Sequence, residues 1–319
     1  MSPAWHVLGA GSIGSLWAAH LARALGTSGV ALVMKQATWA GMGGPSCATI
    51  NVENPEGRSW SAEVKVEHVR AVTPIKRMLV ATKATDACRA VADVAERLQN
   101  DAVILLLCNG MGVYEEITSK DELSRFSYLL GATTHGVYSK GRLDIVHAGF
   151  GQTWIGAPRE SSTSRAGLAP AATSLNLTGL NVAVENCIED VLWRKLAANA
   201  SLNGITALMG CRNGAVVESV WGLKLVEDIC LEISGVLKAG GLLIPEDELL
   251  NFALDVAHKN AFNYSSMYQD ISAGQPTEVD YINGFVITQG ADLGIETPIN
   301  GVIHSLIKLR EEVDSKLYV

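Results

Sequence analysis

The sequence predicts an α/β N-terminal domain with a parallel sheet, followed by an all-α C-terminal domain. Three observations support this prediction: a glycine-rich motif directly after the first apolar run, alternating short apolar runs and helix-period segments in the first half, and only helix-period segments beyond about residue 185. A chain of 319 residues with 48% hydrophobic residues can fill two cores. We therefore expect domains at 1–185 and 186–319.

The expected elements of the first domain are short strands joined by crossover helices. Apolar residues at three- and four-residue spacing predict helices over Ile13–Leu25 and Asp86–Leu98. A turn-rich stretch from Gly136 to Ile155, in which Tyr138–Gly141 separate two short β-prone runs, predicts a hairpin that closes the domain. The candidate strands are Trp5–Leu8, Val30–Met34, Met78–Thr82, Ala102–Leu107 and Tyr128–Leu130.

The second domain is expected to consist of long helices alone, because no strand pattern interrupts its helix-period segments. These segments are Ile188–Leu208, Val217–Ala239, Asp247–Ile271, Val279–Leu293 and Ile299–Leu317.

The composition indicates that the binding partner of this protein is a small molecule. A net charge of -8 argues against nucleic acid, which requires clustered Lys and Arg. The six cysteines are scattered without a C-x-x-C pair or a His at metal-ligand spacing, so we expect no metal and a reducing compartment. The apolar runs are too short for a membrane span and the N-terminus lacks a basic leader, so we expect a cytoplasmic protein that does not bind a membrane.

The glycine motif predicts a dinucleotide site. It reads G-x-G-x-x-G, follows a predicted strand and opens a predicted helix, which is the context that this motif requires. The glycines permit a tight turn and close approach to a pyrophosphate, and the helix N-terminus supplies partial positive charge. The first domain is therefore expected to be a Rossmann domain. The motif consists of Gly9, Ala10, Gly11, Ser12, Ile13 and Gly14.

The residue that leaves the second predicted strand favours NADP(H) over NAD(H). NAD sites usually place Asp or Glu there, to accept a hydrogen bond from the ribose 2′-hydroxyl. This chain has no Asp or Glu before Glu53, and Lys35 stands at the strand end, where a cation suits a 2′-phosphate. The alternative is that Lys35 is an ordinary surface lysine.

Two further polar residues follow predicted strands, where ligands of open α/β sheets bind. They are Lys83 and Asn109, the latter in the glycine-rich turn Asn109-Gly110-Met111-Gly112. From the residues alone a structural role is equally open, because Asn-Gly is a common turn and Lys often flanks a strand.

A polar stripe on a predicted helix of the second domain suggests a ligand. Lys195, Asn199 and Asn203 lie four residues apart and therefore share one face. The residues between them are mostly apolar, so the helix is expected to be packed on most sides and the stripe needs polar partners. A ligand is the simplest partner, and a polar seam between helices is the alternative.

A second polar cluster extends from Asn263 through Ser265 and Ser266 to Asp270. Gly274 and Pro276 follow it and are expected to end one helix and begin another, with Glu278 in the first turn. Glu in a first turn commonly complements the helix dipole, so Glu278 alone does not define a site.

Together these segments resemble the ketopantoate reductases (2-dehydropantoate 2-reductases) over about 280 residues. The resemblance rests on the order and spacing of six motifs. They are the glycine motif, the strand end at Lys83, Asn109-Gly110-Met111-Gly112, Trp193-Arg194-Lys195-Leu196-Ala197 with Asn199 and Asn203, Ser265-Ser266-Met267 with Gln269-Asp270, and Thr277-Glu278-Val279-Asp280-Tyr281-Ile282-Asn283-Gly284.

The resemblance implies NADPH-dependent reduction of 2-dehydropantoate to (R)-pantoate, in pantothenate and coenzyme A synthesis. It implies that Lys195 is the general acid and that Glu278 contacts the substrate and the cofactor and helps to position Lys195. Asn199, Asn203, Asn263 and Ser266 are then expected to bind the substrate. Lys83 and Asn109 are expected to bridge cofactor and substrate, and Lys35 to bind the 2′-phosphate.

The resemblance departs from the family at one position and leaves two alternatives. Members of the family often carry Arg where Lys35 stands, and Lys lacks the bidentate contact of Arg, so the preference for NADPH is expected to be softer here. A sibling reductase of another 2-oxo acid or an imine is one alternative function. A non-catalytic NADPH-sensing protein is another, although a sensor needs no proton donor. We expect a monomer or a homodimer.

Overall fold

The computed structural model describes residues 2–159, 161 and 164–317, without the side chains of 315–317. The chain divides into two compact units. The first consists of Met1–Cys108 and Val113–Glu189, and the second of Asn109–Gly112 and Asp190–Val319.

Within the described residues, the first unit forms a sheet of 11 strands in the order β11-β10-β7-β6-β5-β1-β2-β4-β3-β9-β8. The strands are β1 (Trp5–Leu8), β2 (Val30–Met34), β3 (Cys47–Glu53), β4 (Ser59–His68), β5 (Ile75–Val80), β6 (Leu98–Leu106), β7 (Ser127–Thr133), β8 (Gly136–Gly141), β9 (Asp144–Gly149), β10 (Thr153–Gly156) and β11 (Val182–Val184).

The central strands β7-β6-β5-β1-β2-β4 are all parallel, as the sequence predicts for a Rossmann domain. The helices of this unit are α1 (Ser12–Leu25), η1 (Thr27–Gly29), α2 (Gln36–Ala40), α3 (Ala84–Ala92), η2 (Ala95–Arg97), α4 (Val113–Thr118), α5 (Asp121–Ser124) and α6 (Ser164–Asn176). Strand β1 lies between β2 and β5, so the chain reverses its winding direction at β1. In open α/β sheets, ligands bind at the carboxyl ends of the strands at such a point.

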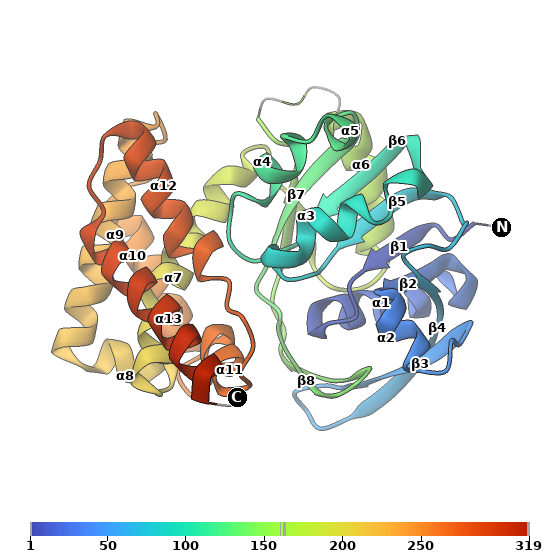
Figure 1. The fold of residues 1–319 in the computed structure, drawn as a ribbon, viewed down its shortest axis with the longest axis horizontal. Coiled ribbons are helices and arrows are strands. Elements are labelled where there is room, and N and C mark those ends of the chain that lie inside the picture. The colour runs from blue at the N-terminus through green and yellow to red at the C-terminus, as the bar shows by residue number, and fades with distance from the viewer. Residues whose placement is uncertain (1, 160, 162–163, 318–319) are drawn as a thin grey trace. The chain divides into compact units, whose positions relative to one another are not determined.

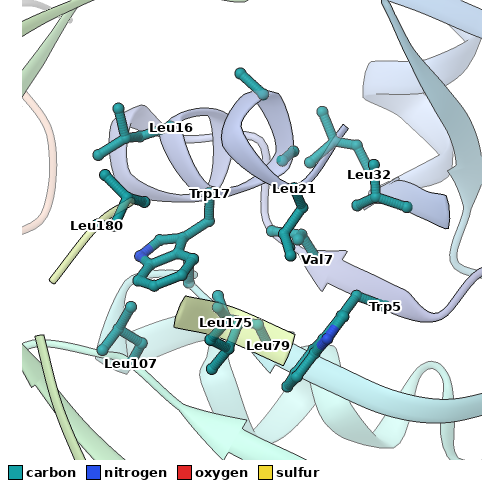
Figure 2. Close-up of a cluster of buried hydrophobic side chains, with 14 of the residues drawn as sticks. Trp5, Val7, Leu16, Trp17, Leu21, Leu32, Leu79, Leu107, Leu175 and Leu180 are labelled. Carbon is teal, nitrogen blue, oxygen red and sulfur yellow. The ribbon is translucent and has the colours of Figure 1, made fainter. Parts of the chain in front are cut away.

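Alternating side chains of the central strands supply two cores. Trp5 and Val7 of β1 point to the face that α1 and α6 cover, where they pack with Trp17 and Leu175, as Figure 2 shows. Trp5 Nε1 also donates a hydrogen bond to Ser174 Oγ at 2.6 Å. The opposite face is covered by α3 and α4 (Figure 1). Helices on both faces explain why β1 and β2 are buried at every position.

Four strands of the first unit, β3, β4, β10 and β11, have no counterpart among the predicted ones. Strands β3 and β4 pair antiparallel, and β3 buries fully only Ile50 and Val52, so its apolar signal is weak. The short strands β10 and β11 pair parallel with each other. The predicted hairpin is present as β8 and β9. Its turn lies at Arg142 and Leu143 and not at Tyr138–Gly141, which belong to β8. The predicted helix Asp86–Leu98 is shorter, because α3 ends at Ala92 and Leu98 opens β6.

The second unit is helical within its described residues. Its elements are α7 (Ile188–Met209, which begins two residues before this unit), α8 (Asn213–Glu218), α9 (Val220–Ala239), α10 (Glu246–Lys259), α11 (Ser266–Ser272), η3 (Val279–Tyr281), α12 (Asn283–Leu293) and α13 (Pro298–Leu317). An apolar core runs along them, with Ile229, Ile233 and Val286 fully buried.

Three predicted helix segments of this unit are wrong in their extent. Val217–Ala239 is divided at Ser219, whose hydroxyl caps α9 by accepting from Gly222 N–H at 3.4 Å. Asp247–Ile271 is divided because α10 ends at Lys259 and Ser265 caps α11. Val279–Leu293 is divided into η3 and α12. Glu278 is the N-cap of η3 and does not lie in the first turn of a long helix, and three residues supply little helix dipole for it to complement.

Candidate active site

The glycine motif follows β1 directly and opens α1. Gly9 has φ +112°, and a Cβ there would lie 2.9 Å from Ala81 O. A Cβ on Gly14 would lie 1.9 Å from Gly9 O. Packing within the protein therefore explains the absence of a side chain at Gly9 and Gly14.

Gly11 has a different explanation. It is the N-cap of α1 with φ -77°, a conformation that any residue can adopt, and a Cβ there would meet nothing within 4 Å. The first N–H groups of α1 have no partners within the helix and its first turn carries no acid, which suits an anion. Nearby Thr82 Oγ1 is buried without a hydrogen-bond partner among the described residues. The site therefore fits a dinucleotide pyrophosphate close to Gly11.

Lys35 and Lys83 both lie at carboxyl ends of strands, as predicted. Lys35 follows β2 and is the N-cap of α2, while Lys83 follows β5 and is the N-cap of α3. Lys35 Nζ donates to both carboxylate oxygens of Asp86, at 3.1 and 3.0 Å. No sequence pattern indicated this carboxylate, because Asp86 is 51 residues further along the chain.

The polar stripe of the second unit lies on α7. Lys195 Nζ donates to Asn109 Oδ1 at 2.9 Å, which connects two residues that are 86 positions apart. Asn199 is half-buried and Asn203 is 8% exposed. Neither side-chain amide has a hydrogen bond to another described residue, which favours a ligand over a seam between helices.

The turn Asn109–Gly112 connects Lys195 to the segment of Glu278. Met111 N–H donates to Tyr281 O at 2.8 Å. Gly110 has φ +80°, and a Cβ there would lie 2.4 Å from Tyr281 O, so this close approach requires glycine. Tyr281 is the last residue of η3 and Glu278 is its N-cap, with 7% exposure. Three segments that are far apart in the sequence thus meet in one cluster.

Helix α13 holds the segment of Glu278 from both sides. Glu311 Oε1 accepts from Thr277 N–H at 2.6 Å. Asp280 contacts His304 Nε2 at 2.7 Å and Lys308 Nζ at 3.0 Å. Burial raises the pKa of Asp280, but the hydrogen bonds from His304 and Lys308 outweigh it, so its pKa lies below the usual value. The backbone around Glu278 is therefore firmly placed.

The two adjacent serines have different environments. Ser265 is buried, caps α11 by accepting from Tyr268 N–H at 3.1 Å, and accepts from Thr206 Oγ1 of α7 at 2.7 Å. Ser266 is the exposed first residue of α11. Asn263 is exposed, and its Nδ2 donates to Asn260 Oδ1 at 3.2 Å. Ser265 therefore serves the fold, and Ser266 is the serine available to a ligand.

The sequence analysis assigned no role of its own to one positioning residue, Asn283. Asn283 is fully buried, and its Nδ2 donates to Ala200 O of α7 at 3.1 Å and to Asn300 Oδ1 at 2.9 Å. Asn300 donates in turn to Glu232 Oε2 at 2.7 Å. Ala200 lies between Asn199 and Ser201, so this network fixes α7 beside the polar stripe. An asparagine between apolar residues, Ile282 and Phe285, was the available signal.

The described part of the chain contains no group of three or more His, Cys, Asp or Glu residues that could hold a metal ion. None of its helices has both the length and the apolar character that a membrane crossing needs.

A glycine motif at the reversal point of a parallel sheet, with a lysine and amide cluster in a helical unit, defines a nicotinamide-dependent oxidoreductase. Two protein-family models identify the family within this class of oxidoreductases. The model described as ketopantoate reductase PanE/ApbA matches residues 5–160, and its C-terminal counterpart matches residues 187–311. The chain belongs to the ketopantoate reductase family.

Individual relatives agree in sequence and fold. A 2-dehydropantoate 2-reductase of Vibrio cholerae is 32% identical, over 97% of this chain and 98% of that protein. A PanE/ApbA family ketopantoate reductase from Ralstonia eutropha has a similar structure, with a TM-score of 0.83 and 24% identity over 98% and 99% of the two chains. A D-mandelate dehydrogenase with NADH and anilino(oxo)acetate reaches a TM-score of 0.87 at 21% identity, with the same coverage.

Proposed function

We propose that this protein reduces 2-dehydropantoate to (R)-pantoate with NADPH, as a step in pantothenate and coenzyme A synthesis. The observation that carries the proposal is the cluster in which Asn109 holds the ammonium of Lys195 and connects, through its turn, to the segment of Glu278. The family to which the chain belongs supports the same reaction.

The reaction needs a hydride donor and a proton donor. Bound NADPH supplies the hydride that adds to the keto carbon. The carbonyl oxygen gains negative charge as the C=O double bond becomes a single bond, and an ammonium within hydrogen-bond reach stabilises that charge. Lys195 then donates a proton to the oxygen as general acid and regains one from water.

The residues of the first unit would hold the cofactor. The backbone of Gly9–Gly14 and the first turn of α1 would bind the pyrophosphate, because Gly11 leaves open space there. Lys35 would bind the 2′-phosphate. Lys83, together with Asn109 of the second unit, would contact the cofactor near its reactive end.

The residues of the second unit would bind the substrate. The amides of Asn199 and Asn203 have no partner among the described residues and would donate to the oxygens of the substrate. Asn263 and Ser266 are exposed and would contact its carboxylate. The buried carboxylate of Glu278 would accept from the terminal hydroxyl of ketopantoate and help to place Lys195.

A reductase of another 2-oxo acid is the second candidate function. The structural similarity to D-mandelate dehydrogenase with NADH favours considering a larger, aromatic 2-oxo acid as substrate and NADH as donor. A non-catalytic NADPH-binding protein is less well supported, because it would not need Lys195.

Consumption of NADPH with three 2-oxo acids tests the proposal. We expect the highest kcat/KM with ketopantoate, a lower value with 2-oxoisovalerate, which lacks the hydroxyl, and the lowest with benzoylformate, the 2-oxo acid of mandelate. A preference for benzoylformate would favour the second candidate. Binding of NADPH without turnover of any of the three would favour a sensor.

We further propose that the protein acts in the cytoplasm as a monomer or a homodimer. None of the six cysteines, all of which lie among the described residues, forms a disulfide, which suits a reducing compartment. A relative of the same fold from Staphylococcus aureus, with a TM-score of 0.78 at 19% identity, is described as a dimeric ketopantoate reductase. Light scattering on the purified protein would decide between the two states.

A further inference from the structure

The ion pair between Lys35 and Asp86 brings a carboxylate to the place where the 2′-substituent of the cofactor is expected. Both oxygens of Asp86 accept from Lys35 Nζ, at 3.1 and 3.0 Å. The two side chains are 62% and 44% exposed, so the pair is open to a ligand.

The order of the strands explains how these two residues meet. Lys35 directly follows β2, and Asp86 lies in the first turn of α3, which follows β5. Strand β1 lies between β2 and β5, so the ion pair bridges the carboxyl end of β1, where the glycine motif begins. The adenosine ribose of a dinucleotide lies beside the end of β2 in this fold.

The two residues have opposite preferences for the 2′-substituent. Lys35 attracts a 2′-phosphate. Asp86 repels the same phosphate, and it can accept a hydrogen bond from the 2′-hydroxyl of NADH, the part that the acid after β2 plays in NAD sites. An exposed ion pair is weak and opens readily, so the carboxylate remains available to either cofactor.

We propose that Asp86 is a specificity-determining residue that lowers the preference of this protein for NADPH over NADH. The inference rests on the proposed function only in that the first unit binds a nicotinamide dinucleotide. It adds a second, opposing residue to the role of Lys35.

The test is the ratio of the dissociation constants of NADH and NADPH, measured by titrating the fluorescence of the nicotinamide. Asp86→Asn keeps the shape and removes the charge. We expect it to raise the ratio about five-fold in favour of NADPH, the effect of one unit charge about 4 Å away in a water-like medium. Lys35→Ala should lower the ratio.

Asp101→Asn is the matched control. Asp101 forms an exposed ion pair with Lys76 at 3.3 Å in the same unit, with side chains that are 67% and 61% exposed. Its charge is removed in the same way, and the ratio should not change. An unchanged ratio in Asp86→Asn, or an equal rise in Asp101→Asn, would overturn the proposal.

The binding ratio separates this inference from the proposed function. If the protein binds both dinucleotides but does not reduce ketopantoate, the proposed reaction fails and the ratio still tests Asp86. If neither dinucleotide binds, the cofactor assignment and the role of Asp86 fail together.

Discussion

Lys195 Nζ and Asn109 Oδ1 lie 2.9 Å apart, so the proposed proton donor is held by an amide from a segment far away in the sequence. An amide oxygen orients an ammonium without neutralising its charge. This relationship identifies Lys195 as the first residue to test.

Lys195→Ala should lower kcat by about 100- to 10,000-fold, as expected for loss of a general acid. The dissociation constant of NADPH should stay nearly the same, because the glycine motif and Lys35 are unaltered. Steady-state kinetics and fluorescence titration measure the two quantities. Lys224→Ala is the control, since Lys224 is 61% exposed on α9 and pairs with Asp228. Activity of Lys195→Ala within a few-fold of wild type would remove Lys195 from this role.

Glu278→Gln should lower kcat/KM more for ketopantoate than for 2-oxoisovalerate. A buried carboxylate costs desolvation unless donors meet it, and the hydroxyl of ketopantoate is such a donor. We expect the wild type to favour ketopantoate on the order of 100-fold in kcat/KM. The substitution keeps the shape but weakens the acceptor, so it should reduce this factor. If both substrates lose activity equally, Glu278 serves Lys195 or the fold instead.

Two glycines of the same motif should respond differently to alanine. Gly11→Ala adds a methyl group in open space, so Tm should hardly change, while the dissociation constant of NADPH should rise on the order of ten-fold. Gly9→Ala places alanine at φ +112°, with its Cβ 2.9 Å from Ala81 O, and should cost about 1 to 3 kcal/mol of stability. Thermal unfolding with and without NADPH distinguishes the two effects. Equal loss of Tm in both variants would contradict this assignment.

A buried pair of histidines should make the first unit sensitive to acid. Gly151 N–H donates to His135 Nδ1 at 3.0 Å, so this nitrogen is an acceptor, and His135 Nε2 donates to Leu180 O at 3.0 Å. His147 Nε2 lies 3.0 Å from His135 Nδ1. Burial, with smaller effects from His135 and His20, lowers the pKa of His147 to about 4.

The sign of the pH effect follows from this lowered pKa. Between pH 6.5 and about 4 the unfolded chain binds a proton at His147 that the folded protein does not, so stability falls with pH, by about 3 kcal/mol for this residue. Tm should therefore fall across this range, and less steeply in His147→Gln. His258→Gln, at an exposed position of α10, should keep the slope of the wild type. An unchanged slope in His147→Gln would show that other groups cause the acid sensitivity.

The sequence predicted the parts of the fold that bury apolar residues at regular spacing. Strands β1 and β2 were predicted with their observed bounds, and α1 within one residue, because all three are largely buried. Strands β3 and β4 were not predicted, since they are only partly buried. Breaks at Ser219 and Ser265 depend on capping hydrogen bonds, which periodicity does not reveal.

The candidate site was predictable where its residues lie close together in the sequence. The spacing of Lys195, Asn199 and Asn203 was sufficient to place them on one face of a helix. The contact between Asp86 and Lys35 was not predictable in this way, because it depends on the order of β2, β1 and β5 in the sheet. The network of Asn283 likewise depends on how α12 packs against α7. The chemical roles of all these residues stay predictions.

The assignment of Asn109–Gly112 to the second unit limits how the protein can be dissected. A fragment that begins at Asp190 would contain every described helix of that unit apart from the first two residues of α7, but not the four residues that pair with Lys195 and Tyr281. The ammonium of Lys195 would lose its amide partner, and Tyr281 O would lose the N–H of Met111. The second unit therefore cannot be expressed alone or transferred to another protein as one continuous segment without losing these contacts. A graft onto another dinucleotide-binding domain would have to carry this turn with it, inserted after the strand that corresponds to β6.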